Sequence, residues 1–160
     1  MNYFELFDIP VSFAVDQQEL AKKFFELQKK FHPDFYSNAT PDEQDEALET
    51  SSMANKALKT FRSVDATIKY VLQSKGLLEE EEKYTLPPAY LMEVLELNEM
   101  KMDGAEEEAI KKRVQELQTE IYTEVAPIIE NYKDGETSTP DLLKVKEYYY
   151  KKKYLDRLTF

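Results

Sequence analysis

Apolar residues recur at helical spacing through most of this chain, and no stretch shows the alternation that is typical of a strand. The first clear case is a stripe with the i, i+4, i+7, i+11 spacing of a helix that buries one face. Its members are Leu20, Phe24, Leu27 and Phe31. Asp16 can cap this helix, with Glu19 in the capping-box position. Pro33 ends it, because the residue before a proline is pushed out of the α region, and His32 is therefore predicted to lie in a loop.

A second helix is predicted to begin at Pro41, since Thr40 can cap it and Glu43 can reach back to the cap. Its buried face consists of Ala47, Ser51, Ala54, Leu58 and Phe61. The two helices are predicted to form an antiparallel hairpin joined by a turn over residues 32–40. The turn contains the tripeptide His32, Pro33 and Asp34.

Short helices over residues 3–8 and 64–74 complete this first unit, and a charge run follows it. Residues 77–82 read Leu-Leu-Glu-Glu-Glu-Glu, which is typical of a solvated connector. We therefore predict a first domain over residues 1–76, a linker over residues 77–87 and a second domain over residues 88–160.

Three helices with short connections are predicted in the second domain. They begin near Pro88, Glu106 and Thr139. The middle helix extends to about Lys133 with a kink at Pro127, because proline removes a backbone donor and clashes with the preceding turn. Its stripe is Ile110, Val114, Leu117, Ile121, Val125, Ile128 and Tyr132, and that of the last helix is Leu142, Val145, Tyr149 and Leu155. The fold class is all-α, with an antiparallel three-helix bundle as the second domain.

The helix that begins at Pro88 has two apolar stripes instead of one. Tyr90, Val94 and Leu97 form the first stripe, which is sufficient to dock the helix on its neighbours. The second stripe consists of Leu91, Met92 and Leu95 and is edged by Glu96 and Glu99. A second stripe is either further core or an exposed patch for a partner, and exposed apolar patches often mark interaction sites. We favour the patch, because a three-helix bundle rarely buries both sides of a helix.

Composition restricts the possible functions. The net charge of −11 argues against general binding to nucleic acids or anionic membranes. The absence of cysteine excludes thiolate nucleophiles and thiolate metal sites. We find no Gly-rich phosphate loop, no Glu-x-x-His pair and no spacing of carboxylates that specifies a metal site, so we expect neither an enzyme nor a resident cofactor. No apolar run is long enough for a membrane span, and the first helix begins close to Met1, so we expect a cytoplasmic protein.

Lysines gather on the first long helix, just before the tripeptide. They are Lys22, Lys23, Lys29 and Lys30. This strip is either an ordinary solvated face, with Glu26 pairing locally at i±4, or a docking surface for an acidic partner. In an otherwise acidic protein we favour the docking surface.

The tripeptide between two helices of this size resembles a J-domain, the module by which co-chaperones recruit DnaK-type ATPases, over residues 1–76. Residues 89–99 resemble the F-L-M-E-x-x-E-L-x-E segment of the HscB family, the J-proteins of iron–sulfur cluster assembly, and residues 2–7 and 154–158 are similar to that family too. Phe35 and Tyr36 depart from it, where a basic residue and then Phe are common. Thr67 replaces an arginine usually found ahead of Tyr70.

The resemblance implies an L-shaped, two-domain co-chaperone that is not itself an enzyme. Its first domain would stimulate ATP hydrolysis by an HscA/DnaK-type chaperone, and its bundle would deliver the IscU-type scaffold protein to that chaperone. The chaperone-binding residues would be His32, Pro33, Asp34, Lys22, Lys23, Lys29 and Lys30. The scaffold-binding residues would be Leu91, Met92, Leu95, Glu96, Glu99 and Tyr154. The alternatives are a J-domain co-chaperone for another client and a helical adaptor without chaperone action.

Overall fold

The computed structural model describes residues 1–158, and every regular element within them is helical. Two compact units are present, Met1–Val71 and Leu72–Phe160, and the division between them falls inside helix α4, Val64–Ser74. We describe each unit by itself. The all-helical fold class predicted from the sequence is confirmed.

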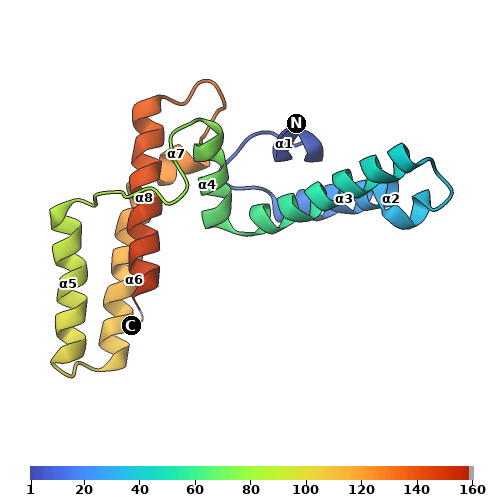
Figure 1. Ribbon diagram of the computed structural model, residues 1–160. Helices are drawn as coiled ribbons and strands as arrows, with labels where there is room; N and C mark the ends of the chain where they lie inside the picture. Colours follow the sequence, from blue (N-terminus) through green and yellow to red (C-terminus); the bar gives the residue numbers. More distant parts are fainter. Residues whose placement is uncertain (159–160) are drawn as a thin grey trace. The chain divides into compact units, whose positions relative to one another are not determined.

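The first unit is built on the antiparallel pair α2, Gln17–Phe31, and α3, Pro41–Arg62, which Figure 1 shows side by side. The predicted caps hold both helices. The Asp16 carboxylate accepts hydrogen bonds from the backbone N–H groups of Gln18 and Glu19 at 2.9 and 3.0 Å, and the Thr40 hydroxyl accepts one from Glu43 N–H at 3.2 Å. Glu19 does not complete the expected capping box, because its carboxylate lies 4.0 Å from Lys23 instead.

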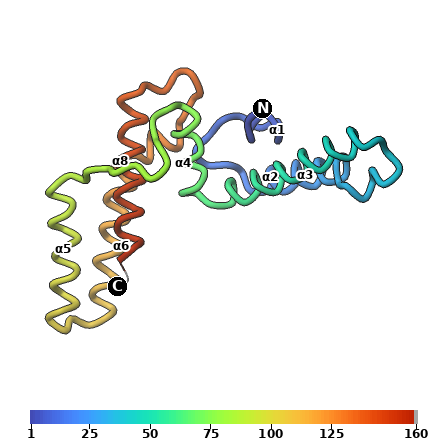
Figure 2. Tube along the Cα trace, in the orientation of Figure 1, coloured from blue at the N-terminus to red at the C-terminus, as the bar shows by residue number. Residues whose placement is uncertain are grey.

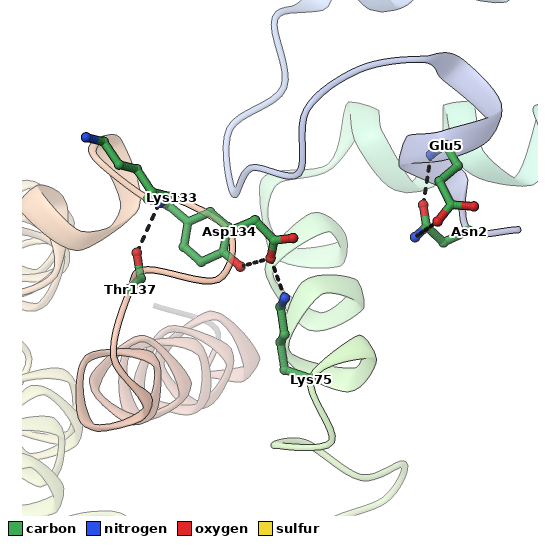
Figure 3. A network of polar contacts seen from close by, with 7 residues as sticks. Asn2, Glu5, Lys75, Lys133, Asp134 and Thr137 are labelled. Atoms are coloured by element: carbon green, nitrogen blue, oxygen red, sulfur yellow. Dashed lines mark hydrogen bonds and ion pairs between the residues drawn. The ribbon is translucent and has the colours of Figure 1, made fainter.

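Helix α1, Tyr3–Phe7, packs against both α2 and α3. Asn2 caps it: the Asn2 side-chain oxygen accepts a hydrogen bond from Glu5 N–H at 2.8 Å, and the Asn2 amide donates to the Glu5 carboxylate at 3.2 Å (Figure 3). The chain then turns through Asp8, whose φ of 52° is left-handed, and leads toward α2. The cap and the turn together set α1 across the base of the hairpin.

An aromatic cluster forms the core where α1, α3 and α4 meet. The Phe61 ring lies 4.8 Å from that of Phe4 and makes edge-to-face contacts with Tyr3, Phe7 and Tyr70 at 6.2, 5.8 and 6.3 Å. Tyr3 and Tyr70 stack at 4.6 Å, and the Tyr70 hydroxyl accepts a hydrogen bond from Tyr3 N–H. Phe61 is thus the common neighbour of four rings from two other helices.

Thr67 also belongs to the core of this unit. Its side chain is buried, and its hydroxyl donates to the backbone carbonyls of Thr60 and Ser63 at 3.1 and 2.8 Å. At this position, where the sequence departs from the HscB pattern, the side chain therefore ties α4 to the end of α3 and is not available to a partner.

The second unit contains α5, Pro88–Met102, α6, Glu107–Thr123, α7, Ala126–Glu130, and α8, Thr139–Arg157. Helices α5, α6 and α8 run antiparallel in sequence order, as the chain trace in Figure 2 shows. α6 lies between the other two, with contacts to both, and α7 packs on α8. The predicted bundle is present, with α7 as an additional short helix.

The prediction of a single kinked helix over residues 106–133 is wrong. α6 ends at Thr123, four residues before Pro127, which is the residue whose carbonyl the proline ring would meet in a continuous helix. A new helix, α7, starts at Ala126. The break shifts the helical register, so that Ile129 is buried and Ile128 is only half-buried.

Residues 77–87 are packed against the bundle instead of being fully solvated. Leu78 and Leu86 are buried, and the Glu82 carboxylate pairs with Lys146 at 2.6 Å. This hydrogen bond lowers the pKa of Glu82. Tyr84 stacks on Tyr150 with ring centroids 4.6 Å apart. The domain limits of 76, 87 and 88 stay a prediction, and the last two residues of the second domain lie outside the described residues.

A second polar anchor holds the α7–α8 loop to the end of α4 (Figure 3). The Lys75 ammonium pairs with the Asp134 carboxylate, which also accepts a hydrogen bond from the Tyr132 hydroxyl at 2.7 Å. These bonds lower the pKa of Asp134, and the pairing with Asp134 raises the pKa of Lys75. Beside them, the Thr137 hydroxyl accepts from Lys133 N–H at 3.0 Å, so the loop is fixed at two points.

Truncating Phe61 to Ala should lower the free energy of unfolding of the first unit by about 3–5 kcal/mol, because it removes the ring that four others contact. Urea unfolding monitored by circular dichroism measures the loss. The matched control on the same helix is Leu48→Ala, which removes a side chain that is 56% exposed and should cost no more than about 0.5 kcal/mol. Equal losses for the two variants would contradict the assigned core.

Candidate functional site

The tripeptide lies in the turn between α2 and α3. His32 has left the helix, with φ −62° and ψ 131°, as expected for a residue that precedes proline. Residues Pro33–Tyr36 then form a single 3₁₀ turn. The His32 and Asp34 side chains both reach solvent, since neither belongs to the apolar face of a helix.

A hydrogen bond from the backbone determines which nitrogen of the His32 ring acts as acceptor. Nδ1 of His32 accepts a hydrogen bond from the backbone N–H of Asp34 at 3.2 Å, and an accepting nitrogen carries no proton. A neutral ring that accepts this hydrogen bond on Nδ1 carries its proton on Nε2, which can donate to a partner. The Asp34 carboxylate lies 3.6 Å from the same Nδ1 and is therefore not ion-paired with it in the neutral ring. Its oxygens remain open to donors from outside.

Two residues that the sequence analysis did not assign to the site hold this turn in place. The Tyr36 hydroxyl donates to the Lys30 carbonyl at 2.8 Å, which closes the turn back onto α2. The Gln44 amide on α3 donates to the carbonyls of Tyr36 and Ser37 at 3.0 and 3.3 Å. Neither has a sequence signal beyond its place near the tripeptide. These hydrogen bonds hold the turn in addition to the one that the His32 imidazole accepts from Asp34 N–H.

The four lysines of the predicted docking surface lie on α2, but they are not equivalent. Lys23 is half-buried and pairs with Asp8 at 3.7 Å and with Glu19 at 4.0 Å. Lys22, Lys29 and Lys30 are exposed, and none of them has a carboxylate within ion-pair distance in the described part of the chain. The local pairing with Glu26 that would make this strip an ordinary solvated face is absent among these residues.

The two stripes of α5 have different environments in the structure. Tyr90, Val94 and Leu97 are buried against the bundle. Leu91, Met92 and Leu95 remain 37%, 59% and 47% exposed, and Glu96 and Glu99 beside them are exposed as well. The exposure expected for the second stripe is confirmed, whereas its role in binding stays a prediction.

Met102 extends this exposed face and was missed in the sequence analysis. It is the last residue of α5 and is strongly exposed. Its position is seven residues after Leu95 and eleven after Leu91, which places it on the same side of the helix. The spacing alone was sufficient to find it.

Tyr90 anchors α5 to α8 beside the exposed face. Its hydroxyl donates to the Lys151 carbonyl at 2.6 Å, and the Lys151 ammonium lies 5.4 Å from the centre of its ring. Burial raises the pKa of the Tyr90 phenol, and the nearby groups Asp156, Glu93 and Tyr154 raise it further. Tyr154, the predicted scaffold contact from α8, is half-buried and lies on the part of α8 that approaches Tyr90.

The described residues offer few other sites. Across residues 1–158, no cluster of three or more His, Asp and Glu side chains is placed to hold a metal ion. None of the helices in this range is long and apolar enough to cross a membrane.

Comparisons with known proteins assign both units to one family. A family described as "HSCB C-terminal oligomerisation domain" matches residues 86–159. The co-chaperone protein HscB homologue of Colwellia psychrerythraea is 34% identical over 125 residues, which cover 78% of this chain and 71% of the relative. The homologue of Vibrio cholerae is 37% identical over 100 residues, 62% of this chain and 58% of the relative.

Solved structures agree with these relatives along nearly the whole chain. The crystal structure of human co-chaperone protein HscB superposes with a TM-score of 0.77 at 30% identity and covers 98% of this chain and 78% of the human chain. Chaperone HscB from Vibrio cholerae superposes with a TM-score of 0.63 at 26% identity, covering 98% of this chain and 96% of that one. The chain belongs to the HscB co-chaperone family, the J-proteins of iron–sulfur cluster assembly, whose members are not themselves enzymes.

Proposed function

We propose that this co-chaperone stimulates ATP hydrolysis by an HscA/DnaK-type chaperone through its first unit and delivers an IscU-type scaffold protein through its second. The single observation that carries the proposal is that each unit exposes a surface of distinct chemistry without a partner group in the described part of the chain. The first is cationic, with the open His32 and Asp34 side chains at its end. The second is apolar with acidic edges.

The chaperone-binding surface consists of His32, Pro33, Asp34, Lys22, Lys23, Lys29 and Lys30. Unpaired ammonium groups attract an acidic partner at long range, and the Nε2–H of His32 and the Asp34 carboxylate supply a donor and an acceptor at close range. Within this set Lys23 contributes least, because Asp8 and Glu19 already compensate its charge. Docking here would favour the ATPase conformation that hydrolyses ATP.

The scaffold-binding surface consists of Leu91, Met92, Leu95, Glu96, Glu99 and Tyr154. Its centre is apolar and its rim acidic, which suits a partner segment that presents apolar side chains next to basic ones. Holding the scaffold on one unit while the other engages the ATPase raises the effective concentration of the client at the chaperone. The protein itself makes and breaks no covalent bond. We also propose that it acts in the cytoplasm, where its partner is supplied with ATP.

Replacing His32 with Gln should abolish stimulation of the ATPase and leave the melting temperature nearly unchanged. The imidazole contributes one exposed hydrogen bond to the turn, which Tyr36 and Gln44 hold by other means. Steady-state ATP hydrolysis by a purified HscA-type chaperone measures the effect, and the matched control in the same turn is Asn38→Ala. A melting temperature that falls with the stimulation would show that His32 is structural here.

Truncating Leu91, Met92 and Leu95 together to Ala should weaken binding to the scaffold protein by about thirtyfold or more with little loss of stability, because their burial occurs only in the complex. Calorimetric titration with the scaffold and a thermal melt are measured on the same variant. The control for exposure is Leu143→Ala on α8, which removes a side chain of similar exposure and should leave the affinity unchanged.

The control for the core is Leu97→Ala, which should destabilise the bundle by about 2–5 kcal/mol. Sedimentation of the native protein and the triple variant tests one more alternative, in which the exposed face of α5 joins copies of this chain. A loss of self-association with unchanged scaffold affinity would assign the face to contacts between copies of this chain and would overturn the proposed client site.

A further inference from the structure

Two exposed aromatic side chains border the chaperone-binding surface. Phe25 is 63% exposed and Phe35 is 69% exposed, although burying an aromatic ring is among the largest apolar gains available to a protein. Each of them contacts a member of the surface directly. A single exposed aromatic side chain is common on protein surfaces. Two that both contact residues of one candidate site indicate an interaction surface.

Phe25 lies among the unpaired lysines of α2. Lys22 precedes it by three residues and Lys29 follows it by four, so the three side chains share one side of the helix. The Lys29 ammonium lies 5.3 Å from the centre of the Phe25 ring, within the range of a cation–π contact. The apolar ring is therefore surrounded by positive charge that no carboxylate of residues 1–158 neutralises.

Phe35 lies on the tripeptide itself. It follows Asp34 in the 3₁₀ turn, and its ring meets the His32 ring edge to face, with centroids 6.2 Å apart and planes at 70°. Its backbone N–H donates to the His32 carbonyl at 3.0 Å, which fixes where the side chain leaves the turn. A partner that reaches the His32 imidazole must also meet this ring.

We propose that Phe25 and Phe35 are the apolar anchors of the chaperone-binding surface, and that the partner ATPase receives them in apolar sockets flanked by carboxylates. This inference rests on the proposed function and adds the chemistry of the partner surface. Aromatic side chains in the centre of an interface often carry most of the binding energy, while exposed charges mainly set the encounter rate. The lysines steer the partner and the two rings hold it.

The division of roles predicts different responses to salt. Attraction by the lysines is screened over about 8 Å at physiological ionic strength, whereas burial of a ring is not weakened by salt. Removing a ring should therefore weaken binding by the same factor at every salt concentration. Removing a lysine should reduce the slope of affinity against salt.

The test measures the co-chaperone concentration that gives half-maximal stimulation of a purified HscA-type ATPase, in a series of sodium chloride concentrations. Phe25→Ala and Phe35→Ala should each raise this concentration by about tenfold or more without changing its dependence on salt. Phe25→Tyr and Phe35→Tyr, which keep the ring, should restore most of the affinity. Lys22→Ala and Lys29→Ala should reduce the salt dependence instead.

The matched control is Leu48→Ala on α3, an apolar side chain of similar exposure that should have no effect. Unchanged half-maximal concentrations for both Phe→Ala variants, alongside complete loss of stimulation by His32→Gln, would overturn the anchors and leave the proposed function intact. Full stimulation by His32→Gln would overturn the proposed function and the anchors with it.

Discussion

In a bundle of only three helices, each helix can bury a single side, and this limit decides which residues of the second unit meet solvent. α5 carries two apolar stripes. Tyr90, Val94 and Leu97 fill the available side, and the Tyr90 hydroxyl fixes it to the backbone of α8. The second stripe has no helix left to cover it, so its apolar area stays in contact with water, where burial by a partner would be favourable. Folding thus uses one side of the helix, and the proposed client binding would use the other.

In the first unit, helix α2 likewise buries only one side. On its other side the positive charge of the lysines matters more than the apolar area. α2 buries one side against α3, and its outer side carries the lysines and Phe25. Among the carboxylates of residues 1–158, those of Asp8 and Glu19 lie close to Lys23, and none lies within ion-pair distance of the other three lysines. The remaining ammonium groups are exposed and carry no compensating ion pair from residues 1–158, in a protein whose net charge is −11. A localised positive surface on an acidic protein directs encounters to one place, because the rest of the molecule repels an acidic partner.

Two prolines determine where helices α2 and α6 end, each by a different steric effect. Pro33 forces His32 out of the helical region, and the turn that follows presents the imidazole and the Asp34 carboxylate to solvent. Pro127 ends α6 at Thr123 and starts the short helix α7. The first break produces a candidate site. The second resets the register, so that Ile129 replaces Ile128 in the core.

The sequence by itself determined most of the helices, because periodicity, caps and prolines are local: Asp16, Thr40 and Pro33 act within a few residues of their own position. It did not determine the separate helix α7, because a proline within a helical pattern can either kink or end the helix. It also determined that α5 has two stripes and that the tripeptide lies in a turn. It could not distinguish Lys23 from Lys22, because the carboxylate of Asp8 reaches Lys23 from another part of the chain. Nor could it show that residues 77–87 pack on α8 through Glu82 and Lys146, or that Phe25 and Phe35 remain exposed. Those outcomes depend on which distant groups the tertiary structure brings within a few ångströms, and local spacing does not contain that information.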